Sequence, residues 1–168
     1  MSLFVARLIP NQPAVKLSFT SFPNFTIKEI ATPYWWFGYN CNYALGRLLI
    51  KADFGYKTMQ AFNDELFGVI NKDTVDMAIG FEYTKNSYNF SSSLSNKKIL
   101  DWQSEITTKE NTDLFTVGIN KSYLNEDLAL NAFTGGTTDI EALFGFVMIN
   151  YKIDDRFTFD SSIFIFSV

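Results

Sequence analysis

The sequence contains no histidine and a single cysteine, Cys41. A lone cysteine excludes an internal disulfide and a zinc site built from cysteines and histidines. The absence of histidine removes the commonest general base, and with it the serine and cysteine triads of the usual kind. These absences argue against an enzyme, and they give no reason to expect a metal or any other cofactor.

Charge is also scarce. Charged residues make up 19% of the 168 residues, below the roughly 25% of ordinary globular domains. The net charge of −4 comes from scattered acids and bases, so no basic stripe is available for a nucleic acid. Aromatic residues are plentiful by contrast, at 17%. Few charges with many aromatic residues point away from disorder and from a well-solvated soluble surface.

Long apolar runs are missing as well. No run reaches the roughly 18–20 residues of a transmembrane helix. The stretch 1–10 is too short for a signal peptide and lacks its basic start. For an exported protein, we therefore expect either that a signal has been removed or that the chain is part of a larger protein.

The chain has instead a strict alternation of apolar and polar residues. The clearest stretch is 74–84, in which every second residue is apolar: Val75, Met77, Ile79, Phe81 and Tyr83. A period of two over nine or ten residues predicts a strand about as long as a tilted strand needs to cross a bilayer. A second alternating stretch, 88–95, follows a tight turn at 85–87 and predicts a hairpin.

The same unit recurs along the chain. Further pairs of alternating stretches, each pair joined by a short turn, are 35–43 with 47–56, 115–120 with 128–134, and 142–151 with 156–167. Two more alternating stretches lie at 2–9 and 15–20. We count about ten strands, of which 2–9 and 128–134 are the weakest. The predicted fold is all-β. It is one domain, 1–168, with an antiparallel up-and-down meander that forms a transmembrane β-barrel or a partial barrel.

The predicted connections alternate in length. Short turns are expected near 10–13, 44–46, 85–87, 125–126 and 154–155. Longer loops are expected near 22–33, 57–72, 96–111 and 135–140, the last with a turn at Gly135-Gly136. Short turns on one side with long loops on the other are typical of bacterial outer-membrane barrels. Tyrosines beside the short turns predict an aromatic girdle at one end of the sheet: Tyr43, Tyr83, Tyr88, Tyr123 and Tyr151.

The polar face of the predicted strands is mostly Ser, Thr, Asn and Gly, whereas soluble strand surfaces carry many Lys and Glu. Such a face suits a water-filled or tightly packed lumen. The charged candidates for its lining are Lys51, Asp53, Asp76, Glu82 and Asp160. Two interpretations of them stay open. They form salt bridges that hold the lumen together, or they line a pore and bias solute passage.

The apolar face suits lipid, because a closed sheet leaves no backbone group unpaired in hydrocarbon. The lipid-facing candidates are Val75, Met77, Ile79, Phe81, Phe115 and Val117. Cys41 shares a face with Phe37 and Tyr39, which predicts a small lipid-facing residue and not a reactive thiol. Apolar residues also occur in the 96–111 loop, and we expect them to pack on the rim in preference to folding inward as a constriction: Ile99, Leu100 and Trp102.

Two stretches of the second half carry a family resemblance, 115–133 (FTVGINKSYLNEDLALNAF) and 147–159 (VMINYKIDDRFTF). The segments 46–56 (GRLLIKADFGY) and 77–83 (MAIGFEY) are in the same style. Across residues 35–168 the chain resembles the C-terminal strands of large porin-like, alginate-export-like outer-membrane barrels. The resemblance implies a class of protein and names no substrate, and no binding residue of the family is carried over.

The end of the chain departs from that family, whose barrels usually end on a terminal aromatic. This chain stops at Phe166-Ser167-Val168. We therefore expect this chain to be a part of a larger barrel and to lack the returning strand. We also expect its first and last strands to match each other poorly.

The sequence thus predicts a porin-like protein of the bacterial outer membrane that allows passive passage of small hydrophilic solutes. Two alternatives stay open: a small non-conducting structural barrel whose interior is filled by side chains, and a soluble lipocalin-like barrel that binds a lipophilic ligand. The expected partners are membrane lipid and small hydrophilic solutes, with no nucleic acid, and a homo-oligomer stays open.

Overall fold

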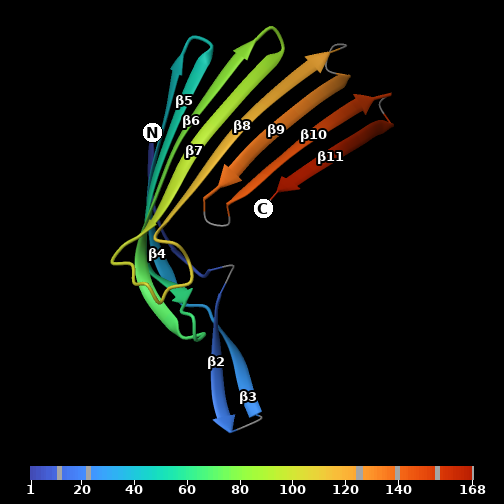
Figure 1. The fold of residues 1–168 in the computed structure, drawn as a ribbon. Helices are drawn as coiled ribbons and strands as arrows, with labels where there is room; N and C mark the ends of the chain where they lie inside the picture. The colour runs from blue at the N-terminus through green and yellow to red at the C-terminus, as the bar shows by residue number, and fades with distance from the viewer. Residues whose placement is uncertain (11–12, 22–23, 124–126, 139–140, 154–155, 168) are drawn as a thin grey trace. The chain divides into compact units, whose positions relative to one another are not determined.

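The computed structural model describes residues 1–168 except 11–12, 22–23, 124–126, 139–140, 154–155 and 168. Every regular element among the described residues is a strand (Figure 1), so the predicted all-β class is confirmed. The strands are β1 (Ser2–Leu8), β2 (Ala14–Ser21), β3 (Asn24–Ile30), β4 (Tyr34–Leu45), β5 (Leu48–Asn63), β6 (Val69–Lys85), β7 (Tyr88–Ile99), β8 (Asn111–Tyr123), β9 (Leu128–Thr137), β10 (Ala142–Lys152) and β11 (Thr158–Ser167).

Nine of these strands form one antiparallel sheet, in the order β1-β4-β5-β6-β7-β8-β9-β10-β11. From β4 onward each strand lies beside its successor, as the predicted meander requires. β2 and β3 pair with each other in a separate two-stranded sheet. The outermost strands of the large sheet are β1 and β11, so the sheet is not closed into a barrel.

The chain divides into two compact units. The first unit comprises 1–40, 53–77 and 97–112, and the second unit comprises 41–52, 78–96 and 113–168. The second unit contains the short connections of β4–β5 and β6–β7. Their hairpin ends lie at the same end of the sheet (Figure 1), where the Thr84 N–H donates to the Arg47 carbonyl at 3.1 Å.

Two of the predicted short turns are close to their expected places. The β4–β5 turn contains Gly46, whose φ of +60° suits a residue without a Cβ. In the β6–β7 turn, Asn86 and Ser87 have φ of +49° and +64°, the conformation that a two-residue hairpin requires. The predicted turns at 125–126 and 154–155 lie outside the described residues.

The predicted short turn at 10–13, of which 11–12 lie outside the described residues, does not join neighbouring strands. β1 pairs with β4, with Leu8 opposite Tyr34 and Ser2 opposite Asn40. Aromatic packing accompanies this pairing. The Phe4 ring lies over Gly38 and packs edge-on against the Trp36 ring, with the ring centroids 4.6 Å apart. The chain between β1 and β4 forms the β2–β3 hairpin, so strand 24–30 occupies most of the predicted loop 22–33.

Two other predicted loops are shorter than expected. The predicted loop 57–72 shrinks to residues 64–68, because β5 continues to Asn63 and β6 begins at Val69. Asp64 makes the tight turn possible: its Oδ1 accepts the N–H groups of Leu66 at 2.9 Å and Gly68 at 2.6 Å. The predicted loop 96–111 shrinks to 100–110 for a similar reason, since β7 continues to Ile99.

Gly135 and Gly136 form no loop turn, which corrects the prediction for 135–140, and instead lie buried within β9. A Cβ on Gly136 would meet the side chains of Leu143 and Phe115 at 2.7 Å, and one on Gly135 would lie 2.9 Å from the Phe144 ring. The two glycines therefore let large side chains of the neighbouring strands lie flat against the backbone of β9.

The first unit has a small apolar core formed by Phe62, Ile99 and Ile106, with Ile70 and Trp102 packed against it. The loop 100–110 is held there by hydrogen bonds: the Trp102 Nε1–H donates to the Thr108 carbonyl at 2.8 Å. Ile99 and Trp102 thus pack against Phe62 of β5 and Ile70 of β6.

The core of the first unit generates a stability prediction. Ile99 is 1% exposed, so Ile99→Ala should lower the free energy of unfolding by about 2–4 kcal/mol through lost contacts and a residual cavity. Urea unfolding followed by tryptophan fluorescence measures this, because Trp102 packs on the core. Ile9→Ala is the matched control. Ile9 is 71% exposed, and its truncation should change stability by less than about 0.5 kcal/mol. Equal losses for the two variants would contradict this account of the core.

Candidate functional site

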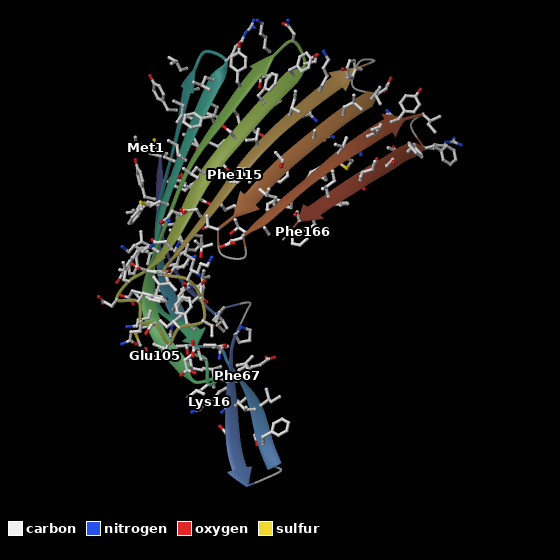
Figure 2. The ribbon with its side chains drawn as sticks, viewed as in Figure 1. Met1, Lys16, Phe67, Glu105, Phe115 and Phe166 are labelled. Atoms are coloured by element: carbon white, nitrogen blue, oxygen red, sulfur yellow. The ribbon has the colours of Figure 1, made fainter. Side chains whose placement is uncertain are left out.

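The apolar face of the strands is the more exposed one, which reverses the usual arrangement of a soluble sheet. Along β6, Ile79 and Phe81 are exposed, while their neighbours Gly80 and Glu82 are half-buried. β8 repeats the pattern, with Val117 exposed beside a half-buried glycine. Side chains stand off both faces of these strands (Figure 2). Of the lipid-facing candidates, five are exposed and Val75 is half-buried: Met77 49%, Ile79 42%, Phe81 39%, Phe115 43% and Val117 50%.

The opposite, polar face carries a cross-strand ion pair in the second unit. The Lys51 ammonium of β5 contacts the Glu82 carboxylate of β6. Gly80 lies next to this pair, and a Cβ there would be 3.8 Å from the Cβ atoms of Lys51 and Ser93. These contacts place all four residues on one face. Because both charged side chains are more than a third exposed, the pair adds little stability but neutralises two charges on that face.

The first unit carries a second pair of the same kind. The Lys57 ammonium of β5 contacts the Asp76 carboxylate of β6, and its Nζ lies 5.8 Å from the centre of the Trp36 ring. Asp53 lies two residues after Lys51 on β5, hence on the same face, and is exposed. Within the described residues, it makes no ion pair.

Four strands of the second unit are linked by a ladder of side-chain hydrogen bonds. The Asn120 amide donates to Asn131, and the Asn131 Nδ2 donates to the Asn150 Oδ1 at 3.2 Å. Asn150 in turn donates to the Asp160 carboxylate at 2.5 Å. Of the five charged candidates, Asp160 is therefore the one that ends this amide ladder. We did not single out the three asparagines from the sequence, since only the register shows that they meet.

Phenylalanines also gather on the polar face, and the sequence analysis missed them. Phe133 of β9 stacks with Phe144 and Phe146 of β10, at centroid distances of 6.0 and 5.3 Å. Phe146 packs against Phe164 of β11 at 5.7 Å. Phe133 lies opposite Phe146. Asn131 of the amide ladder lies two residues before Phe133 on β9, on the same face, so this cluster borders the ladder. The sequence signal was available in β11, where residues 163–166 are apolar without alternation.

The tyrosines lie on the described strands as predicted, each near a short connection. Tyr123 and Tyr151 share one row of the sheet, because both lie opposite Leu128. Lys121 lies among them, with its Nζ 3.5 Å from the centre of the Tyr88 ring and 4.8 Å from that of Tyr123. Exposure at this end is high for Tyr43 and moderate for the rest: Tyr43 61%, Tyr83 38%, Tyr123 40% and Tyr151 40%.

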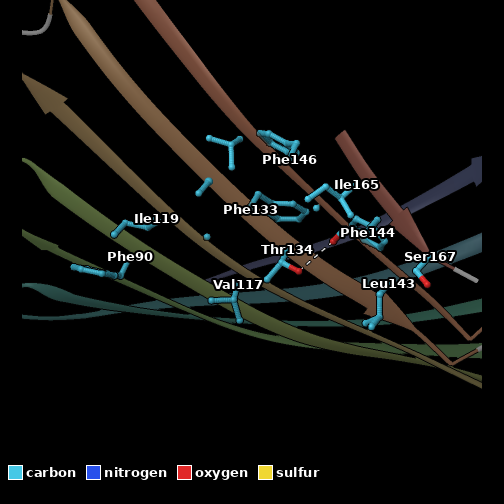
Figure 3. Close-up of a pocket in the computed structure, with 14 residues that line it drawn as sticks. Phe90, Val117, Ile119, Phe133, Thr134, Leu143, Phe144, Phe146, Ile165 and Ser167 are labelled. Atoms are coloured by element: carbon cyan, nitrogen blue, oxygen red, sulfur yellow. Dashed lines mark hydrogen bonds between the residues drawn. The ribbon is translucent and has the colours of Figure 1, made fainter. Parts of the chain in front are cut away.

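A hollow of about 620 Å³ opens over β7 to β11 of the second unit (Figure 3). One row of residues crosses it, in which Val117 lies opposite Thr134, Thr134 opposite Gly145, and Gly145 opposite Ile165. Its lining is almost entirely apolar, and the one threonine hydroxyl there donates to the Phe144 carbonyl at 3.2 Å.

Neither metal chemistry nor a helical membrane span has a visible basis in the described part of the chain. No group of three or more Cys, Asp or Glu side chains there is placed to hold a metal ion. No helix there is long and apolar enough to cross a membrane. Cys41 is free and half-buried.

The amide ladder generates a second prediction. Asn131→Ala removes the central link, which accepts one hydrogen bond and donates another, so stability should fall by about 1–3 kcal/mol. Chemical unfolding followed by circular dichroism measures the change. Asn42→Ala, at an exposed position of β4, should stay within about 0.5 kcal/mol of the parent. A loss at position 131 no larger than that at position 42 would mean that the ladder holds nothing together.

Comparison with known proteins finds no match to this chain among protein families, among curated proteins or among solved structures.

Proposed function

We propose that this chain forms a wall of a porin-like barrel in a bacterial outer membrane, which allows passive passage of small hydrophilic solutes. The observation that carries the proposal is the reversed alternation, in which the apolar side chains of Ile79, Phe81 and Val117 are more exposed than their polar neighbours. In water this face would cost free energy, at about 25 cal/mol per Å² of apolar surface. Against lipid tails it costs none.

The position of charge supports the same proposal. On the apolar face of β8, the mid-strand residues are Phe115, Val117 and Ile119, and Lys121 lies beside the tyrosines. Tyrosine and lysine are the side chains that favour the boundary between hydrocarbon and water. The apolar face therefore has the layered chemistry of a lipid-facing surface, with a belt at the short-turn end.

The polar face suits contact with water and small solutes. Four of its charges are paired across strands, Lys51 with Glu82 and Lys57 with Asp76. Asp53 and Asp160 make no ion pair within the described residues, so the lining presents hydrogen-bonding groups with a small negative field. Under the proposal, such a lining passes small polar molecules without strong selection by charge. The solute therefore remains a class, small and hydrophilic.

Lipid sets one further requirement on the proposed form. A strand edge in hydrocarbon leaves backbone N–H and C=O groups without partners, at several kcal/mol each. β1 and β11 are the edges of the sheet. The membrane-embedded form must therefore pair both edges, with each other or with further strands.

A small non-conducting structural barrel is the second candidate, and one observation favours it. The cluster of Phe133, Phe144, Phe146 and Phe164 lies on the face that a water-filled lumen would use. Side chains of this size can fill the interior of a narrow barrel. A soluble lipocalin-like barrel, with the hollow of about 620 Å³ as its ligand site, is the third.

Face-specific lysine substitutions test the membrane orientation. Ile79→Lys places a cation in the lipid-facing row, where it should cost about 2–4 kcal/mol and reduce insertion into phospholipid vesicles. Ala78→Lys is the matched control, one residue away on the polar face, and should insert normally. Flotation of vesicles with bound protein measures both variants. Equal insertion of the two would contradict the assigned faces, and a parent chain that stays soluble without detergent would favour the lipocalin-like alternative.

Conductance separates the first candidate from the second. We expect the complete barrel that contains this chain, reconstituted in planar bilayers, to give stepwise, weakly charge-selective currents, because most charges of the polar face are paired. Vesicles that swell in an isotonic solution of a small sugar would agree. Protein that inserts, as flotation shows, yet conducts under no bilayer condition would remove the porin proposal and support the structural barrel.

A further inference from the structure

Most residues that line the hollow lie on the apolar face, where it has the form of a trough along β9. Away from the tyrosine end, Leu130 is followed on this face of β9 only by the small residues Ala132, Thr134 and Gly136. The flanking strands keep larger residues beside them, with Ile119 opposite Ala132 on β8 and Val147 opposite Ala132 on β10. Both of these residues line the hollow, which therefore has a low floor between two walls.

One end of the trough is closed by large side chains. Gly136 has Phe115 on one side and Leu143 on the other, and both side chains reach to 2.7 Å from where its Cβ would be. The opposite end leads toward Lys121, since Lys121 lies two residues beyond Ile119 on β8. At about 3.3 Å per residue, Lys121 is about 13 Å from Val117 along the strand.

The hydroxyl on the floor of the trough is already satisfied. The Thr134 hydroxyl donates to the Phe144 carbonyl at 3.2 Å, so the floor offers a methyl group and no free donor (Figure 3). A floor of this kind gives water no partners, and a hollow of about 620 Å³ falls within the range of about 300–1,000 Å³ typical of ligand sites. The trough therefore suits a flexible hydrocarbon chain.

The tyrosine end supplies the complementary polar part. Lys121 lies over the Tyr88 ring and close to that of Tyr123, and within the described residues it makes no ion pair. Its ammonium and the two phenol hydroxyls form a small group of donors on the same face as the trough. Such a group is complementary to a phosphate.

We propose that the trough along β9 and the Tyr88–Lys121–Tyr123 group together bind one phospholipid with an anionic headgroup. The phosphate lies at Lys121, and one acyl chain runs along Ala132 and Thr134 toward Gly136. The proposal rests on the proposed function, because it takes this face to meet lipid, and it adds a specific lipid site to a surface that would otherwise contact lipid without selection.

Native mass spectrometry of the full chain in detergent tests this, with phosphatidylglycerol and zwitterionic phosphatidylcholine as probes. The parent should retain one phosphatidylglycerol and prefer it to phosphatidylcholine. Lys121→Met keeps the apolar stem and removes the cation, so this preference should fall about five-fold. Lys16→Met, which removes an exposed lysine from β2, should leave the preference unchanged.

A second pair of variants tests the acyl-chain part. Ala132→Phe fills the floor and should weaken retention of both lipids about ten-fold, the affinity that two buried methylene groups supply. Ile163→Phe adds a ring in the same row of the sheet but outside the lining of the hollow, and should bind as the parent does. Circular dichroism establishes that each variant is folded.

Each outcome bears on one proposal. Protein that floats with vesicles but retains no lipid, or retains both lipids equally in all variants, would overturn the lipid site and leave the proposed function standing. Protein that does not associate with vesicles at all would overturn the proposed function. A dimer that Ala132→Phe disrupts, without bound lipid, would assign the trough to a second copy and overturn the inference.

Discussion

The structure depends on the register between neighbouring strands. In a strand, successive side chains point to opposite faces, so a slip of one residue would move every side chain of that strand to the other face. Along β8 to β11 the register holds Val117, Thr134, Gly145 and Ile165 in one row. The ion pairs, the amide ladder and the trough all require that the strands keep this alignment. Each is a property of several strands together and of none alone.

The two faces solve different physical problems. On the polar face, charges and amides meet partners on the next strand, so that half-buried polar groups such as Asn131 are satisfied. Of the two interpretations of the charged residues, the pairs Lys51–Glu82 and Lys57–Asp76 agree with cross-strand bridges. On the apolar face the side chains have no such partners. Under the proposed function, hydrocarbon covers that face.

The division between the faces is weakest at β9 to β11. There the phenylalanine cluster occupies the face that carries asparagines one row away, and the end of β11 is apolar on both faces. Glycines at 135 and 136 accommodate this crowding, because the rings of Phe144 and Phe115 lie where a Cβ would be. The trough arises because small residues of β9 lie beside large residues of the neighbouring strands. The packing of these strands and the proposed lipid site therefore have one cause.

The sequence by itself determined most of the strands and, except at β9 to β11, the two faces, because alternation is a local property with a period of two residues. It placed strand 24–30 in a loop. It correctly separated Ile79 and Phe81 from Gly80 and Glu82, and it located the turns at Gly46 and Asn86. It could not determine which strands pair. The β1–β4 pairing, the β2–β3 hairpin between them and the place of Gly135-Gly136 inside β9 depend on packing between residues distant in sequence. The same holds for the amide ladder, since Asn120, Asn150 and Asp160 become neighbours only when tertiary structure fixes the register.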